Sequence, residues 1–438
     1  MKVDGSKVRI ALAGVIIGVL LGAYIGFSAS PSTTQIIGGG IYPGAPSYTI
    51  WKEGSNYFAK NANGEIVFSG TSASQVVQNT IDIMNEGELL FLKAGVYQPF
   101  FITINKAIHI KGEMGAYKGN IASYGTSIRD GDYGGAAQNK PMINITLPST
   151  FDDAAQPIIL EDLSIVHWLD APSDYAISVT NAQCIFSNLH IDCHGKGGGG
   201  IEFSGSGATT GFTTIENCRI RRFTNLGVYI HTSSGSFLIS NCHIESYITS
   251  AKACVEFEQT GGSTITGGEY VCAYGAGILL DRSGRNHIEN VWFEACRVSI
   301  NMTDETATSA EGTHNNVVLN CIFASETYDY YNVVFDWASR NIVLYPWPWD
   351  NATNTNYAAL FTAHSRYNRI EGFKVLWMVN YEIEAGALGS IIVDEHGYFN
   401  STRDSVIPQT DCRIWNLDDH NWNIYNGTHW VLPDGTET

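Results

Sequence analysis

The sequence predicts an all-β solenoid, a parallel β-helix, on the strength of two observations. A short phrase, apolar-x-Asn-x-x-apolar, recurs along residues 160–370 at intervals of 23 to 30 residues, and its clearest copies begin at Ile215, Ile239 and Ile288. A repeat of this length is too short to bury a core of its own. It becomes stable only when neighbouring repeats stack.

Each repeat also contains a second alternating segment and lacks a helix signal. Val228-Tyr-Ile230, Val255-Glu-Phe257 and Ile278-Leu-Leu280 are examples, set between Gly- and Ser-rich turns. Two or three short strands per repeat are expected of a parallel β-helix, where equivalent positions of successive coils stack about 4.8 Å apart. The alignment of the repeats therefore predicts which side chains are neighbours.

The third position of the phrase predicts a column of residues in left-handed backbone conformation. It is mostly asparagine, and Gly267 interrupts it; both residue types tolerate this conformation. The column consists of Asp162, Asn188, Asn217, Asn241, Asn290 and Asn320. In this column the chain resembles the right-handed β-helix proteins of the pectate-lyase-like superfamily, which use such Asn ladders. The resemblance implies a right-handed coil, but no single activity, because many chemistries share the scaffold.

The chain divides into five predicted segments. They are a signal-anchor or transmembrane segment (1–30), a flexible stalk (31–47), β-hairpins with a capping helix (48–87), the parallel β-helix (88–375) and an aromatic-rich C-terminal β cap (376–438). The capping box at Ser72 predicts the start of the helix. In the pectate-lyase-like families a helix commonly closes the N-terminal end of the solenoid, so the resemblance implies that role here. The cap is expected to cover the open C-terminal edge.

The first segment contains an uncharged, mostly apolar run, residues 10–27, preceded by basic residues. It is either a cleaved signal peptide or a retained membrane helix, and its length and poor cleavage context favour retention. The basic residues predict a cytoplasmic N-terminus, so the rest of the chain is expected outside the cell, secreted if the segment is cleaved. Two such helices can approach closely at a glycine stripe, which predicts a homo-oligomer. The stripe consists of Gly14, Gly18, Gly22 and Gly26.

Net charge and cysteine content limit the kinds of binding partner and the redox compartment that fit this protein. The formal net charge is −18, which argues against nucleic acid as a partner. Nine cysteines form an odd count without a Cys-x-x-Cys spacing, and Cys218, Cys242 and Cys321 share one column of the repeat. We expect most of them to be buried free thiols. Free thiols are unusual in an exported protein and indicate a prokaryotic or reducing setting.

Two outward columns largely alternate in charge. One column consists of Asp192, Arg221 and Glu245, and its neighbour consists of His190, Arg219, His243 and Glu269. Stacked opposite charges predict a self-neutralising surface ladder, in which each pair contributes under about 1 kcal/mol.

A further outward column does not neutralise itself. It consists of Thr180, Ser204, His231, Glu258, Asp281, Asn301 and Asp336, and beside it Glu202, Tyr229 and Glu256 stack on successive coils. Glu258 above Asp281 would cost roughly 3 kcal/mol of repulsion at an effective dielectric of 20. The pair therefore requires a proton, a cation or a neighbouring arginine, for which Arg282 is the local candidate.

Three interpretations of this patch are open. In a hydrolase, Glu258 and Asp281 have the close spacing of a retaining pair, whereas Glu202 and Glu256 suit an inverting pair around Tyr229. In a lyase, the carboxylates of Glu258 and Asp281 would hold Ca²⁺ against a uronate, and Arg282 would abstract the proton. In the third, the carboxylates are simply solvated at a turn. The candidate catalytic residues are Glu258, Asp281, Arg282 and Glu256, and the candidate substrate-binding residues are Glu202, Tyr229 and His231.

The motifs of the catalytic families are missing. The chain lacks the Asn-Thr-Asp, Gly-Asp-Asp, Gly-His-Gly and Arg-Ile-Lys motifs of polygalacturonase-type β-helices and the Arg-x-Pro-x-x-Arg segment of pectate lyases. No residue role can therefore be transferred from them. We predict a cell-surface β-helix protein that binds a polysaccharide, with cleavage by a lyase or hydrolase mechanism left open. The alternative is a non-catalytic structural, adhesion or surface-assembly protein.

Overall fold

The structure is a computed structural model. It describes residues 45–113, 125–132, 135, 138, 140–147, 156–170, 174–205, 211–232, 236–304, 306, 312–324, 331–349, 357–372, 380–384, 390–393, 413–416, 421–425 and 430–431. Within these ranges no helix is both long and apolar enough to cross a membrane. The apolar run at residues 10–27, its glycine stripe and most of the stalk lie outside the described residues, so these predictions stay predictions.

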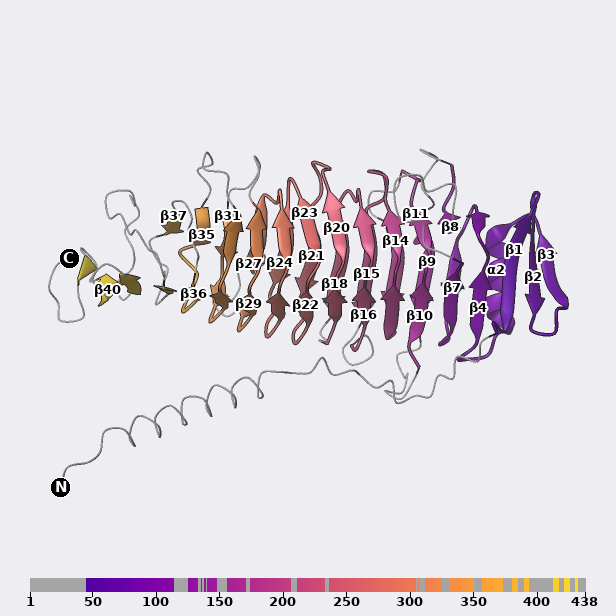
Figure 1. The fold of residues 1–438 in the computed structure, drawn as a ribbon, viewed down its shortest axis with the longest axis horizontal. Helices are drawn as coiled ribbons and strands as arrows, with labels where there is room; N and C mark the ends of the chain where they lie inside the picture. The colour runs from indigo at the N-terminus through magenta and orange to yellow at the C-terminus, as the bar shows by residue number, and fades with distance from the viewer. Residues whose placement is uncertain are drawn as a thin grey trace, which may run out of the picture. The chain divides into compact units, whose positions relative to one another are not determined.

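Three long parallel sheets run along the solenoid (Figure 1). The parallel part of sheet A contains β4 (Leu89–Leu92), β7 (His109–Gly112), β10 (Ile158–Glu161), β13 (Cys184–Ser187), β16 (Thr214–Glu216), β19 (Leu238–Ser240), β22 (Thr264–Thr266), β25 (His287–Glu289), β29 (Val317–Leu319), β33 (Ile342–Leu344), β36 (Arg369–Glu371), β38 (Ile391–Val393) and β39 (Arg413–Asn416). Sheet B contains β5 (Gly95–Tyr97), β8 (Thr126–Arg129), β11 (Ser164–Val166), β14 (His190–Asp192), β17 (Arg219–Arg221), β20 (His243–Ser246), β23 (Glu269–Cys272), β26 (Trp292–Glu294), β30 (Ile322–Ala324) and β34 (Trp347–Trp349).

Sheet C carries the longest strands of the solenoid. It contains β6 (Ile102–Ile104), β9 (Ile143–Thr146), β12 (Tyr175–Thr180), β15 (Gly199–Gly205), β18 (Leu226–Thr232), β21 (Ala253–Glu258), β24 (Ala276–Asp281), β27 (Val298–Thr303), β31 (Tyr331–Phe335), β35 (Tyr357–Phe361) and β37 (Asn380–Ile383). A small fourth sheet pairs β28 (Thr313–His314) with β32 (Ala338–Ser339). In the repeats described in full, sheets A, B and C each receive a strand from every coil, which confirms the predicted parallel β-helix.

The recurring phrase forms the corner between sheets A and B. In one copy Ile215 lies in β16, Ile220 lies in β17, and Asn217 between them has a φ of 53°. The other predicted members of the column, and Gly267, also have positive φ. The sequence therefore identified the corner correctly, because a left-handed residue favours Asn or Gly.

The continuous amide ladder lies at a different corner. Asn286, Asn316, Asn341 and Asn368 are buried, and each of the first three donates its Nδ2 to the Oδ1 of the next at 2.9 to 3.0 Å. Their backbone amides donate to the same oxygens at 2.9 to 3.0 Å. The predicted column has one such side-chain contact, from Asn188 to Asp162 at 3.2 Å. The signal for the buried ladder was present, since each of these asparagines lies two residues before the first apolar position of the phrase.

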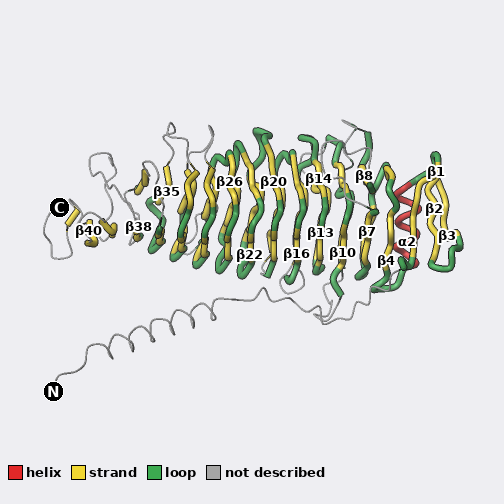
Figure 2. Tube along the Cα trace, in the orientation of Figure 1, coloured by secondary structure: helices red, strands yellow, loops and turns green. Residues whose placement is uncertain are grey.

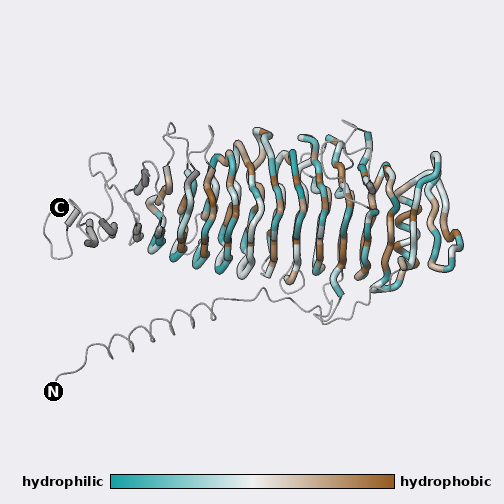
Figure 3. The backbone as a smooth tube through the Cα atoms, viewed as in Figure 1, coloured by the Kyte–Doolittle hydropathy of each residue, from teal (hydrophilic) through white to brown (hydrophobic). Residues whose placement is uncertain are grey.

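Alternate side chains of the three sheets fill one hydrophobic core. Figure 3 shows apolar segments recurring from coil to coil. Eight cysteines are buried and free, as the sequence predicted for most of them, while Cys412 lies outside the described residues. Burial raises the pKa of the Cys321 thiol to about 12, so this sulfur behaves as a small apolar core group.

Antiparallel strands and one described helix adjoin the N-terminal coils (Figure 2). β1 (Tyr48–Glu53), β2 (Asn56–Asn61) and β3 (Ile66–Gly70) form a meander, and β1 pairs in parallel with β4. Helix α2 (Ala73–Ile83) begins where the Ser72 Oγ accepts from the Gln75 amide, and it buries Val76, Val77 and Ile81. At the other end, β40 (Asn421–Tyr425) pairs antiparallel with β39 and with β41 (Trp430–Val431).

Candidate functional site

The outward face of sheet C brings the predicted site residues together. In register, Glu202, Tyr229 and Glu256 form one column on β15, β18 and β21, and His231, Glu258 and Asp281 form the next on β18, β21 and β24. One prediction is wrong: Thr303 continues the column of Asp281, and Asn301 pairs with Leu279 instead. The physical reason is that both Ile300 and Met302 of β27 point into the core. The strand therefore ends at Thr303, two residues beyond the end at Asn301 that the sequence predicted.

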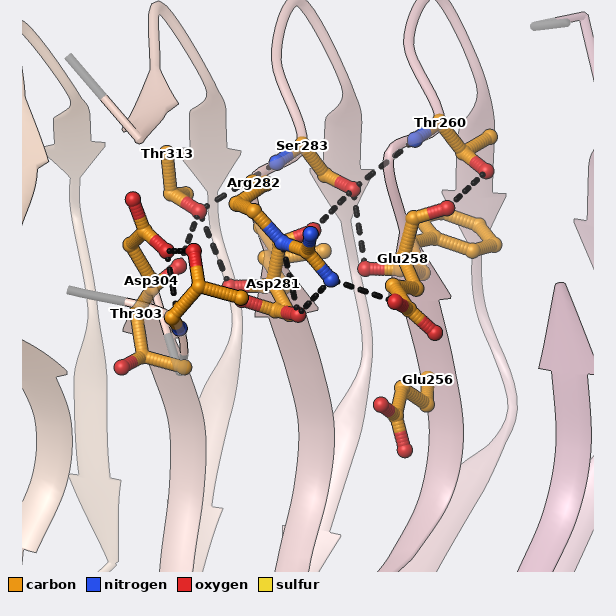
Figure 4. A network of polar contacts seen from close by, with 12 residues as sticks. Glu256, Glu258, Thr260, Asp281, Arg282, Ser283, Thr303, Asp304 and Thr313 are labelled. Carbon is orange, nitrogen blue, oxygen red and sulfur yellow. Dashed lines mark hydrogen bonds and ion pairs between the residues drawn. The ribbon is translucent and has the colours of Figure 1, made fainter. Parts of the chain in front are cut away.

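Arg282 bridges the two stacked carboxylates. Its Nε and Nη2 donate to Asp281 Oδ2 at 3.2 and 2.9 Å, and its Nη2 also donates to Glu258 Oε1 (Figure 4). The Asp281 side chain is 2% exposed and that of Glu258 is 26% exposed. Arg282, the neighbouring arginine predicted from the sequence, therefore offsets the charges of Glu258 and Asp281.

The charge of Arg282 is reinforced by this arrangement. Partial burial alone would lower its pKa, but hydrogen bonding and charge from Asp281, with those from Glu258, raise it overall. The guanidinium therefore remains charged across the accessible pH range and offsets both carboxylates.

A hydroxyl network fixes the turn that follows Arg282. Arg282 itself is in the left-handed region, with a φ of 49°. The buried Ser283 donates its Oγ to the carbonyl of Phe257 at 2.8 Å, and its amide donates to Thr313 Oγ1 at 3.3 Å. Its Oγ also accepts from the Thr260 amide at 3.1 Å, so neighbouring coils are tied together at this turn (Figure 4).

Two diagonal hydrogen bonds flank a pair of stacked rings. Tyr229 and His231, two residues apart on β18, have ring centroids 4.3 Å apart at an interplanar angle of 15°. The Tyr229 Oη donates to Glu258 Oε2, and His231 Nε2 lies 3.1 Å from Glu202 Oε1. Burial, and then the hydrogen bond to Glu258, raise the pKa of Tyr229, so its hydroxyl keeps its proton. The two partly exposed carboxylates are therefore oriented by neighbouring rings.

The remaining predicted carboxylate is not accessible. The Glu256 side chain is 3% exposed, and its Oε1 forms an ion pair with Lys252 Nζ at 3.0 Å. Sequence reasoning missed Lys252 and also Ser178, whose Oγ donates to Glu202 Oε2 at 3.1 Å. The signal for Ser178 was its place in the same column as Glu202, one coil earlier.

The pair Glu258 and Asp281 does not fit a Ca²⁺ site. Ca²⁺ takes six to eight oxygen ligands, whereas the guanidinium of Arg282 already contacts both carboxylates. Across the described residues, no group of three or more His, Cys, Asp and Glu side chains could hold a metal ion. No chemical step is therefore assigned to calcium.

The charge columns of sheet B have the predicted register, but Asp192 and His190 are buried, so the ladder lies only partly on the surface. Arg219 Nη2 donates to Glu245 Oε1 at 2.7 Å, and His243 contacts Glu245 at 3.2 Å and Glu269 at 2.7 Å. The hydrogen bond to Glu245 is the main cause that raises the pKa of His243. Hydrogen bonds from His243 and then Arg219, opposed by burial, lower the pKa of Glu245 to about 2.

Comparison with known proteins supports the fold. Residues 170–342 match the family model for a right-handed β-helix region, and no curated relative matches the sequence. One similar structure is full-length tailspike protein 2 from Escherichia coli O157:H7 bacteriophage CAB120, at 13% identity and a TM-score of 0.50, with 74% of this chain and 40% of the tailspike covered. Another is the enzymatically active domain of bacteriophage CBA120 tailspike protein 2, at 12% identity and a TM-score of 0.50, with 78% and 50% covered. This chain thus spans half or less of either tailspike chain, and such low identity establishes the right-handed β-helix alone.

Proposed function

We propose that this right-handed β-helix protein binds a polysaccharide on the outward face of sheet C, around Glu202, Tyr229, His231 and Glu258. The observation that carries the proposal is the stacked pair Tyr229 and His231, with a partly exposed carboxylate hydrogen-bonded at each ring. Aromatic rings contact the apolar faces of sugars, and oriented carboxylates accept hydrogen bonds from their hydroxyls. The predicted signal or anchor segment would place this face outside the cell.

Burial favours binding over cleavage in both carboxylate pairs considered from the sequence. Asp281, of the retaining pair, is 2% exposed and held by Arg282. Glu256, of the inverting pair, is 3% exposed and held by Lys252. Each pair thus keeps only one accessible member, whereas glycoside hydrolysis needs two.

Cleavage is the second candidate function. The observation that favours it is that the two accessible carboxylates, Glu202 at 25% and Glu258 at 26% exposure, lie on either side of the Tyr229 and His231 strand. One similar structure is also described as an enzymatically active domain. A passive surface scaffold remains the alternative outside carbohydrate recognition.

Affinity electrophoresis of the full chain against a panel of soluble polysaccharides tests the proposal. We expect Tyr229→Ala/His231→Ala to weaken binding at least about tenfold, which corresponds to 1.4 kcal/mol. Tyr247→Ala removes an aromatic ring that is 56% exposed outside sheet C, so it is the matched control and should bind like the wild type. Equal binding by the double variant and the wild type would refute the sheet C site.

A reducing-end assay on the same polysaccharides separates the two candidates. Release of new ends by the wild type, lost in Glu258→Gln, would establish cleavage. Binding without new ends supports recognition alone.

A further inference from the structure

One outward column of sheet B changes character along the solenoid. In register it consists of His190, Arg219, His243, Glu269, Trp292, Ile322 and Trp347. The first four members are polar or charged and include the ion-paired ladder, whereas the last three are large and apolar. The apolar residues of this column do not belong to the core, because the core is filled by the alternate residues of the same strands, which point inward. The change in character therefore concerns the outer face of the sheet.

The apolar members of the column are exposed or half-buried. Trp347 is 46% exposed, and Tyr345, at the corner two residues before it, is 51% exposed. Trp292 and Ile322 are half-buried. We call Trp292, Ile322, Trp347 and Tyr345 the aromatic stripe. Two exposed and two half-buried large apolar side chains in one row form a contiguous apolar surface, the kind of feature that marks binding surfaces on soluble proteins.

The spacing of the stripe fits a chain of sugar rings. Successive coils lie about 4.8 Å apart, so Trp292 and Trp347, two coils apart, are separated by about 10 Å. One coil is close to the length of one pyranose residue in an extended polysaccharide. A glycan lying along the solenoid would therefore present a ring to each coil, and every second ring would meet an indole.

Charges beside the stripe select the kind of glycan. Glu294 lies on the same face of β26 as Trp292, and Glu269, 38% exposed, precedes Trp292 in the column. Both carboxylates can accept hydrogen bonds from sugar hydroxyls. Glu269 is paired with His243 at 2.7 Å, so the repulsion of uronates and sulfates comes mainly from the net charge of −18. In an interface between two copies of this acidic chain the same carboxylates would lose water, which is costly.

We infer that the aromatic stripe on sheet B is a second carbohydrate-binding surface, specific for a neutral polysaccharide. This inference rests on the proposed function and extends it, since the stripe and the carboxylate site lie on different sheets. Trp292 and Trp347 stack against sugar rings, and Glu269 and Glu294 accept hydroxyl hydrogen bonds at the edge of the stripe.

The test compares full-chain variants on neutral polysaccharides (dextran, mannan, xylan) and on polygalacturonate. We expect the wild type to bind at least one neutral polymer and not polygalacturonate. Trp347→Ala should weaken binding about threefold and Trp292→Ala/Trp347→Ala at least about tenfold. Phe212→Ala, which removes a ring that is 71% exposed elsewhere, is the control and should have no effect. Thermal unfolding followed by circular dichroism checks that each variant is folded, and Trp347→Phe should keep most of the affinity.

Several outcomes would overturn the inference. The first is that the folded Trp347→Ala variant binds with wild-type affinity. The second is that the wild type binds polygalacturonate but no neutral polymer. The third is that the wild type binds none of the four polymers. A change of oligomeric state with unchanged glycan affinity, measured by light scattering, would identify the stripe as an interface between copies. Loss of binding in the tryptophan variants with retention in Tyr229→Ala/His231→Ala would support the stripe and refute the sheet C site.

Discussion

Sheets B and C stack charged side chains on the same coils in opposite ways. On sheet B, Arg219 lies one strand from His243 and contacts Glu245, so charges of opposite sign meet between neighbouring coils. On sheet C, Glu258 lies above Asp281, and a single guanidinium from the following turn holds both. The sheet B ladder is neutralised by several partners, whereas on sheet C one guanidinium contacts both members of the like-charged pair.

The difference separates a structural surface from a candidate site. A ladder with several partners tolerates the loss of one, because each remaining pair still offsets part of the charge. A like-charged pair with one bridging residue is unfavourable without it. Carboxylates held in this way are preorganised acceptors, which is the arrangement that a ligand-binding face requires. The predictions below test this contrast.

The largest effect is expected from removing the bridge. Arg282→Met removes the guanidinium that contacts both the buried Asp281 carboxylate and Glu258, and we expect a loss of about 3 kcal/mol in the free energy of unfolding. Arg219→Ala on sheet B is the matched change and should cost under about 1 kcal/mol. Urea denaturation measures both. Equal costs would show that the two sheets do not differ in this way.

Glu245 should show how the sheet B ladder depends on pH. Its folded pKa of about 2 lies below the unfolded value, so its contribution is present above about pH 4.5 and is lost as the pH falls toward 2. Because this change removes the charge that pairs with both Arg219 and His243, we expect Glu245→Gln to cost up to about 2 kcal/mol at pH 7 and almost nothing near pH 2. Unfolding free energies at both pH values test this, and a cost that does not change with pH would contradict it.

The turn that carries Arg282 offers a milder test of sheet C. Ser283→Ala removes the hydroxyl that donates to Phe257 and accepts from Thr260. We expect a loss of about 1 to 2 kcal/mol, because the buried amide of Thr260 loses its acceptor. Polysaccharide affinity should fall with it if Arg282 must hold Glu258 in place. Reduced stability with unchanged affinity would separate the turn from the site.

The smallest effect is expected at His243. Its folded pKa is raised above the unfolded value of about 6.5, so its contribution is complete below that pH and is lost as the pH rises through the folded pKa. His243→Gln should cost under about 1 kcal/mol at pH 5.5 and nothing near pH 9. Titration of the imidazole by NMR provides the direct measurement, and a midpoint below 6.5 would contradict the assignment.

Register explains which contacts were predictable. The stacking of Glu258 on Asp281 followed from the repeat alignment, and Arg282 followed from the need to offset two negative charges. The pairing of His231 with Glu202 was not predicted, because a diagonal contact depends on side-chain rotamers as well as on register. Asn301 was misplaced because coil length varies between repeats, and only core packing fixes where each strand ends.

The sequence by itself determined the solenoid. Its period, its alternation of apolar residues and its left-handed corner asparagines are properties of single residues and their spacing, and spacing is preserved when coils stack in parallel. Tertiary structure decided which carboxylates are accessible, which corner carries the buried amide ladder, and that the outward face of sheet B changes from charged to aromatic along the solenoid. These features depend on how turns of unequal length bring side chains from different coils together, and that is set by packing in three dimensions.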